Sequence, residues 1–153
     1  MSPHPTDVTS TVEAEHEHIK ETMTLLADEL ARDVEPADFP QWKLTYLWRL
    51  RDFQAMLLKH FDLEEEGGFT TDLLRLAPHR ANQIRQVEAE HRKIMALLTQ
   101  LTGLLKRMDR LTDVRMARLR DQLQDLVALI RTHEAAECEL IQAAYYEDFG
   151  VGD

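Results

Sequence analysis

The five residues Val12-Glu13-Ala14-Glu15-His16 recur without change as Val87-Glu88-Ala89-Glu90-His91. In both copies an isoleucine follows the histidine by three residues, as Ile19 and as Ile94. The copies lie 75 residues apart in a chain of 153 residues. This repeat predicts that the chain consists of two similar halves.

A second spacing repeats at nearly the same distance. His60 precedes Glu64 by four residues, and His133 precedes Glu137 by four residues, 73 positions further along. Residues four apart lie on one face of an α-helix. The two halves are therefore predicted to be similar helical hairpins, related by an approximate two-fold axis once they pack together.

Four long segments carry stripes of apolar residues that step alternately by three and four positions, the period of a helix with one buried face. The stripes read Val12, His16, Ile19, Met23, Leu26, Leu30; then Tyr46, Leu50, Phe53, Leu57, His60, Glu64; then Ile84, Val87, His91, Ile94, Leu98, Leu101, Leu105, Met108; and finally Leu119, Leu123, Leu126, Ile130, His133, Glu137, Leu140, Ala144. The sequence thus predicts an all-α fold, an up-and-down antiparallel four-helix bundle with short connections.

Residues that commonly start or stop a helix set the expected boundaries of the helices. A capping box at residues 10–13 is predicted to start the first helix, and Gly67-Gly68 is predicted to stop the second. A linker with about one helical turn is expected at residues 70–76. The four predicted helices cover residues 10–33, 38–66, 78–108 and 113–148. The whole chain, residues 1–153, is predicted to be a single domain with a core at about residues 9–148.

The amino-acid composition argues against several classes of protein. Five glycines and five prolines are too few for the turns of a sandwich or barrel. The net charge of −10 disfavours nucleic acid and anionic lipid as partners. No run approaches the ~20 apolar residues of a membrane span, and the start of the chain does not read as a secretory signal. The single cysteine, Cys138, excludes an internal disulfide and fits a cytoplasmic location.

Polar residues interrupt the apolar stripes at six positions: His16, His60, Glu64, His91, His133 and Glu137. A carboxylate in a core is expensive unless it is paired or binds a metal. The first two histidines lie 20 and 24 residues from Pro36, and the other two lie 20 and 22 residues from Leu111. In antiparallel helices rising ~1.5 Å per residue, all four histidines therefore share one layer of the bundle.

Six inward ligands exceed the needs of a four-coordinate zinc site, so two metal ions are predicted. The two carboxylates can bridge both ions, and the four imidazoles divide between them. This mixed nitrogen and oxygen set suits iron best, with manganese or zinc as alternatives. Positions should remain open for water, an oxygen species or another small molecule.

These residues resemble the haemerythrin-like (HHE cation-binding) family over roughly residues 12–146. The family's pattern is a histidine, His-x-x-x-Glu, a second histidine and a second His-x-x-x-Glu on successive helices, matched here by His16; His60 and Glu64; His91; His133 and Glu137. The resemblance implies a non-haem di-iron centre in a four-helix bundle, with both glutamates bridging the irons.

The chain departs from the oxygen-carrying haemerythrins at two places. Those proteins have a second histidine on the third helix in His-x-x-x-His spacing, where this chain has Met95 after His91 and Val87 before it. They also have His-x-x-x-x-Asp on the fourth helix, where this chain has His133-x-x-x-Glu137. One fewer imidazole implies a more open iron, suited to binding, sensing or reducing O2, peroxide or nitric oxide rather than to simple oxygen carriage.

Two other functions remain open from the residues: a metal buffer without turnover, or a structural bundle, zinc-filled or metal-free, that binds a protein partner. The remaining candidate ligands are expected to lie outside the centre. His18 is interpreted as a surface residue, neither His79 nor His4 is expected to be a ligand, and Glu13 and Glu88 are interpreted as charged flanks. Glu65, Glu66, Glu134 and Glu139 are expected to be solvated, although any of them could orient an imidazole. Cys138 is expected to be a small packed thiol.

Overall fold

The computed structural model describes residues 7–146, and all regular structure in that range is helical. The α-helices are α1 (Asp7–Ala31), α2 (Phe39–Glu66), α3 (Phe69–Leu76), α4 (Ala81–Lys106) and α5 (Asp113–Ile141). Short 3-10 turns at Pro36–Asp38 and Pro78–Arg80 precede α2 and α4, and a π-helical turn at Gln142–Tyr146 follows α5. The expected all-α class is confirmed. None of the described helices is both long enough and apolar enough to cross a membrane.

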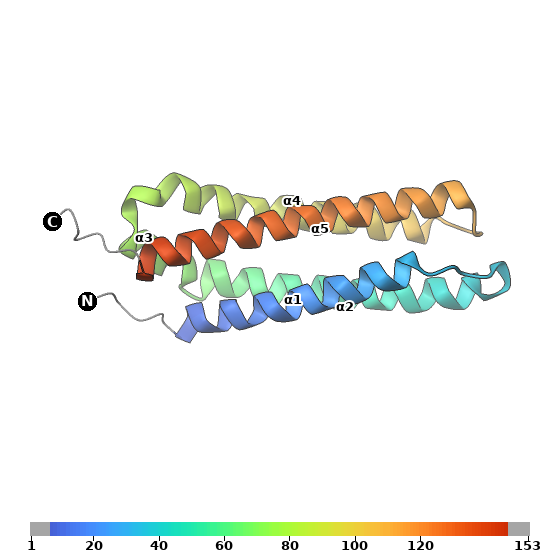
Figure 1. The fold of residues 1–153 in the computed structure, drawn as a ribbon, viewed down its shortest axis with the longest axis horizontal. Helices are drawn as coiled ribbons and strands as arrows, with labels where there is room; N and C mark the ends of the chain where they lie inside the picture. Colours follow the sequence, from blue (N-terminus) through green and yellow to red (C-terminus); the bar gives the residue numbers. More distant parts are fainter. Residues whose placement is uncertain (1–6, 147–153) are drawn as a thin grey trace.

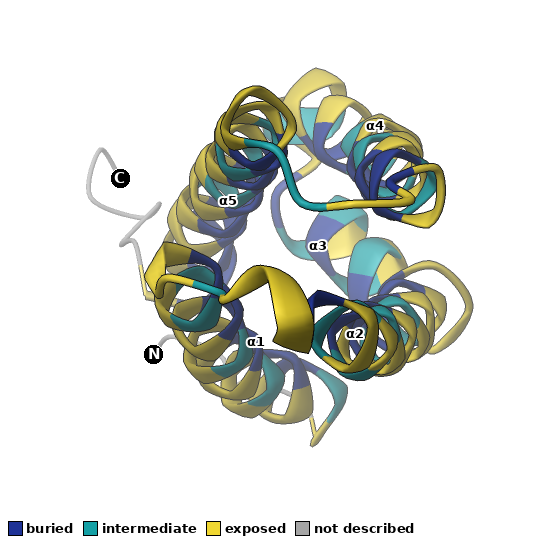
Figure 2. Cartoon of the chain, turned by 90° about the vertical axis from the view of Figure 1, so that its right-hand side faces the viewer, coloured by how far each residue is buried: buried dark blue, intermediate teal, exposed yellow. Residues whose placement is uncertain are grey.

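Four long helices lie side by side, and the short α3 closes one end (Figure 1). α1 packs against α2 and α5, and α4 packs against the same two helices. Viewed end-on, the buried residues of all four face a common interior (Figure 2). Each helix thus contributes one apolar face to a shared core.

The apolar stripes read from the sequence are the buried faces of the helices. Every stripe position, from Val12 in α1 to Ala144 after α5, is at least nine-tenths buried. Tyr46 belongs to the core as its place in the stripe indicated, and its hydroxyl donates to the carbonyl of Leu26 at 2.8 Å. The three-and-four spacing therefore identified the inward-facing side chains correctly.

Several predicted boundaries need correction. The prediction that a capping box at residues 10–13 starts the first helix is wrong, because α1 begins by Asp7 and these residues lie inside it. The expected single turn at residues 70–76 is the eight-residue helix α3, which begins after Gly68 in the left-handed region at φ 102°. α5 begins with Thr112 as its cap, whose hydroxyl accepts from the backbone N–H of Arg115. Its predicted end near Asp148 lies outside the described residues.

The core is divided into two apolar clusters. The larger one fills most of the length of the four helices, with Leu50, Leu98 and Leu126 among its members. The smaller one lies at the α3 end, where Phe69 and Leu73 of α3 pack with residues such as Ile84. The buried histidines and glutamates belong to neither cluster. They form a polar layer enclosed at both ends by apolar side chains, which limits the access of bulk water along the helix axes.

Candidate metal centre

The four long helices bring all six predicted ligands into one layer of the interior. α1 supplies His16, α2 supplies His60 and Glu64, α4 supplies His91, and α5 supplies His133 and Glu137. Each of these residues is at most 4% exposed. Because α1 and α4 run opposite to α2 and α5 (Figure 1), residues far apart in sequence reach the same height.

The ligand atoms form two overlapping groups. His16, His60, Glu64 and Glu137 each offer an atom within 4.8 Å of the others, and so do Glu64, His91, His133 and Glu137. Both glutamates belong to both groups, whereas each histidine belongs to one. A group of two imidazoles and two carboxylates could hold a metal ion.

Corresponding contacts in the two halves are nearly equal. His16 Nε2 lies 3.0 Å from Glu137 Oε1, and His91 Nε2 lies 2.9 Å from Glu64 Oε1. Within each i,i+4 pair the Nε2–carboxylate distance is 3.4 Å on α2 and 3.3 Å on α5. The ring centroids of His16 and His60 lie 5.1 Å apart, and those of His91 and His133 lie 4.9 Å apart.

Most of these ligand atoms lack a hydrogen-bond partner. The Nε2 atoms of His60, His91 and His133 and both carboxylate oxygens of Glu64 are buried and unsatisfied. Some approach one another at hydrogen-bond distance, but without the alignment of a hydrogen bond. Unsatisfied buried polar atoms are costly. His16 Nε2 and Glu137 Oε1 share a hydrogen bond at 3.0 Å, whereas the other ligand atoms converge on the same space without hydrogen bonds to each other. Such a convergence of lone pairs fits a bound cation, so the residues present suit a metal centre.

A second set of carboxylates holds the outer nitrogen of three of the histidines. His60 Nδ1 donates to Glu15 at 2.8 Å, and His133 Nδ1 donates to Glu90 at 2.9 Å. His91 Nδ1 donates to Glu65 at 2.7 Å. Such a bond fixes the tautomer that leaves Nε2 free for a metal, as is usual behind metal-binding histidines.

Sequence reasoning missed the roles of two of these carboxylates, although the repeat contained the signal. Glu15 and Glu90 each stand immediately before a repeated histidine, yet each serves a histidine of the following helix. The carboxylates weighed as possible ligands, Glu13 and Glu88, form no hydrogen bond or ion pair with a ligand histidine within residues 7–146. Glu65 is exposed as expected, and it is one of the residues that the sequence allowed to orient an imidazole, because its carboxylate accepts from His91.

The pKa values of the two buried glutamates are shifted in opposite directions. Burial raises the pKa of Glu64, but its contacts with Glu137 and with histidines outweigh burial and hold it well below its usual range. Burial raises the pKa of Glu137 well above its usual value, and the neighbouring Glu64 raises it further. Burial lowers the pKa of His60 and of His91, but the carboxylates around each raise it on balance. The protons held here would have to leave when a cation binds.

Two residues beside the centre differ from the sequence interpretation. Glu134 was expected to be solvated but is buried, because it points between α1 and α5 rather than outward. Cys138 was expected to be a packed thiol but is an exposed, free cysteine. His18 is exposed as expected, and His79 is exposed as well. His4 lies outside the described residues.

No family model, curated protein or solved structure matches the chain. The centre is therefore interpreted from its own residues: six buried side chains of ligand type, the interior space they share and the carboxylates behind three of the histidines.

Proposed function

We propose that the chain is a haemerythrin-like protein that holds two iron ions in a non-haem di-iron centre and binds, senses or reduces a small oxygen or nitrogen species. The observation that carries this proposal is the pair of overlapping ligand groups, each with two imidazoles and both glutamates. Mixed nitrogen and oxygen ligands suit iron, with manganese or zinc as alternatives.

We also propose that the four long helices form an up-and-down bundle of two hairpins related by an approximate two-fold axis. The matched distances support it, because these four imidazole–carboxylate contacts form two pairs of nearly equal length, one contact of each pair in each half. In such a bundle Glu64 and Glu137 face each other across the axis. They would be the two residues that hold both ions.

The residues of the centre divide into three roles. Four histidines would each bind one ion through Nε2, and Glu64 and Glu137 would hold the ions together. The iron pair would supply electrons and a coordination position for O2, peroxide or nitric oxide. Apolar side chains at both ends of the layer exclude bulk water.

The outer carboxylates should act as positioning residues. Replacing Glu90 with glutamine exchanges a charged acceptor behind His133 for a neutral one, so the imidazole becomes a poorer ligand. We expect metal affinity to fall about 10- to 100-fold. Competition with a chelator of known affinity measures this fall.

The matched control is Glu88→Gln, two residues away on the same helix, which should bind metal like the wild type. Urea unfolding of the metal-free proteins should separate a positioning role from a structural one. Equal affinities in Glu90→Gln and Glu88→Gln would show that the carboxylate behind His133 does not tune metal binding.

The proposed function is tested by metal analysis followed by reaction. Protein purified from iron-replete medium should contain two iron ions per chain. The reduced protein should change its optical spectrum on addition of O2, peroxide or nitric oxide. Fewer than one metal ion per chain would count against a di-iron centre and favour a structural bundle. Two ions with no optical change would favour a metal buffer.

A further inference from the structure

The two sides of the proposed centre are not equally covered. On the α2–α4 side, the ring of Phe61 stacks on His91 with centroids 4.0 Å apart and ring planes 12° from parallel. Glu65 accepts a 2.7 Å hydrogen bond from the outer nitrogen of the same histidine. An aromatic ring and a carboxylate thus close this side.

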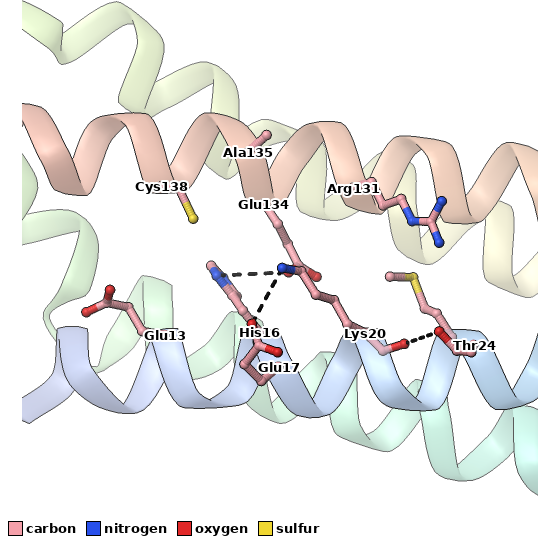
Figure 3. Close-up of a pocket in the computed structure, with 10 residues that line it drawn as sticks. Glu13, His16, Glu17, Lys20, Thr24, Arg131, Glu134, Ala135 and Cys138 are labelled. Atoms are coloured by element: carbon pink, nitrogen blue, oxygen red, sulfur yellow. Dashed lines mark hydrogen bonds and ion pairs between the residues drawn. The ribbon is translucent and has the colours of Figure 1, made fainter.

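The corresponding side, between α1 and α5, is open. The 73-residue offset that relates His60 to His133 places Glu134 where the first half has Phe61, and Cys138 where it has Glu65. A pocket of about 530 Å³ lies there (Figure 3), and His16 lines it together with both of these residues. The departure from the repeat therefore leaves a path from the surface to one ligand histidine.

Glu134 stands in this path with its carboxylate unsatisfied. The residue is 4% exposed, and neither carboxylate oxygen has a hydrogen-bond partner. Its Oε2 lies 4.0 Å from Nδ1 of His16, at the inner end of the pocket. A buried carboxylate without a partner is costly to fold around. Its position between the surface and a ligand histidine suits a group that receives a cation.

The pocket as a whole is also suited to a cation. Its lining includes three carboxylates, those of Glu13, Glu17 and Glu134, against the two cationic side chains of Lys20 and Arg131. The Lys20 ammonium lies 3.5 Å from Glu17 and is more than half exposed. Carboxylate, thiol and imidazole groups, all present here, are ligands of divalent transition metals.

We propose that the pocket between α1 and α5 is the route by which a divalent metal ion reaches and leaves the centre, and that Glu134 binds the ion on its way to His16. This inference rests on the proposed metal centre. The opposite side, closed by Phe61 and Glu65, is not a route.

The exposed thiol of Cys138 allows a direct test, because it is the only cysteine in the chain and lines the pocket. Alkylation with a bulky maleimide should obstruct the route. The measurements are the rate of Fe²⁺ uptake by the metal-free protein without oxygen, and the rate of iron release from the loaded protein to a chelator. Both rates should fall about tenfold or more, while the final content stays at two ions per chain.

Two variants serve as controls for the alkylation. Cys138→Ala treated with the same reagent should exchange metal like the untreated protein. In that background, Asp62→Cys places a thiol on the exposed surface beside Phe61, on the closed side. Alkylation there should leave both rates unchanged. Equal slowing at the two positions would overturn the route.

The role of Glu134 is tested by Glu134→Gln, which keeps the size of the side chain. Uptake and release should each slow by about tenfold, with two ions per chain at equilibrium. Wild-type rates in this variant would overturn the role of Glu134, and wild-type rates after alkylation of Cys138 would overturn the route itself. An untreated protein that takes up no iron would overturn the proposed centre together with this inference.

Discussion

Replacing His60 with alanine should reduce the purified protein from two iron ions per chain to fewer than one. His60 lies on the buried face of α2, offers an unsatisfied Nε2 to the centre and donates its Nδ1 hydrogen bond to Glu15. The substitution removes one of the two imidazoles in the group that His60 forms with His16, Glu64 and Glu137. Both glutamates then lose a neighbouring imidazole. Replacing a residue that only hydrogen-bonds to a metal ligand already lowers metal affinity roughly 10- to 100-fold. We therefore expect the loss of the ligand itself to lower metal affinity by about 100-fold or more.

The counterpart His133→Ala should behave in the same way, because His133 occupies the matching position in the other ligand group. The control is His18→Ala, which removes an exposed imidazole only two residues from His16. This variant should keep two ions per chain. Metal analysis and chelator competition measure all three proteins. Full metal content in both His60→Ala and His133→Ala would mean that these imidazoles are not ligands.

The sequence was sufficient to locate the six buried polar residues because two independent features of it agree. The helical stripe placed them inward, and the count of residues from each connection placed the four histidines at one height. Helix geometry is regular enough for both inferences, so the structure buries all six as expected. Sequence signals for the start of a helix were less reliable. The Ser and Glu of the expected capping box lie within α1, which includes Asp7.

The surroundings of the centre were harder to predict, because they depend on contacts between helices. Glu15 lies beside the buried stripe of its own helix, and the packing of α1 on α2 brings it to His60. Likewise, Glu134 looked solvated because it follows a stripe residue, but the neighbouring α1 covers it. A stripe gives the direction of a side chain, whereas its partner depends on how the helices are rotated against each other.

Without metal, Glu137→Gln should make the protein more stable at pH 8, although it removes a proposed ligand. Burial and the neighbouring Glu64 raise the pKa of Glu137 well above its unfolded value near 4.5. The folded state therefore binds a proton that the unfolded state releases. The contribution of Glu137 is most favourable below pH 4.5 and is lost as the pH rises toward the raised pKa.

Glutamine imitates the protonated carboxyl at every pH, so the variant avoids this loss. We expect its free energy of unfolding at pH 8, in the presence of a chelator, to exceed that of the wild type by about 1–3 kcal/mol. The difference should shrink as the pH falls toward 5, because the wild-type carboxyl then takes up its proton. Urea unfolding at both pH values measures it.

Metal should reverse the order of stability. An ion that binds only the folded state stabilises it by about 4 kcal/mol at a free concentration 1,000 times its Kd. The wild type should gain this amount, whereas Glu137→Gln, which lacks one of the two carboxylates shared by both ligand groups, should gain little. Glu66→Gln, at an exposed position on α2, should follow the wild type with and without metal. A Glu137→Gln protein that is less stable in chelator and is still stabilised fully by iron would mark Glu137 as a structural carboxylate. The expected reversal requires a carboxylate that lowers the free energy of unfolding in the presence of chelator and raises it only when a cation is bound.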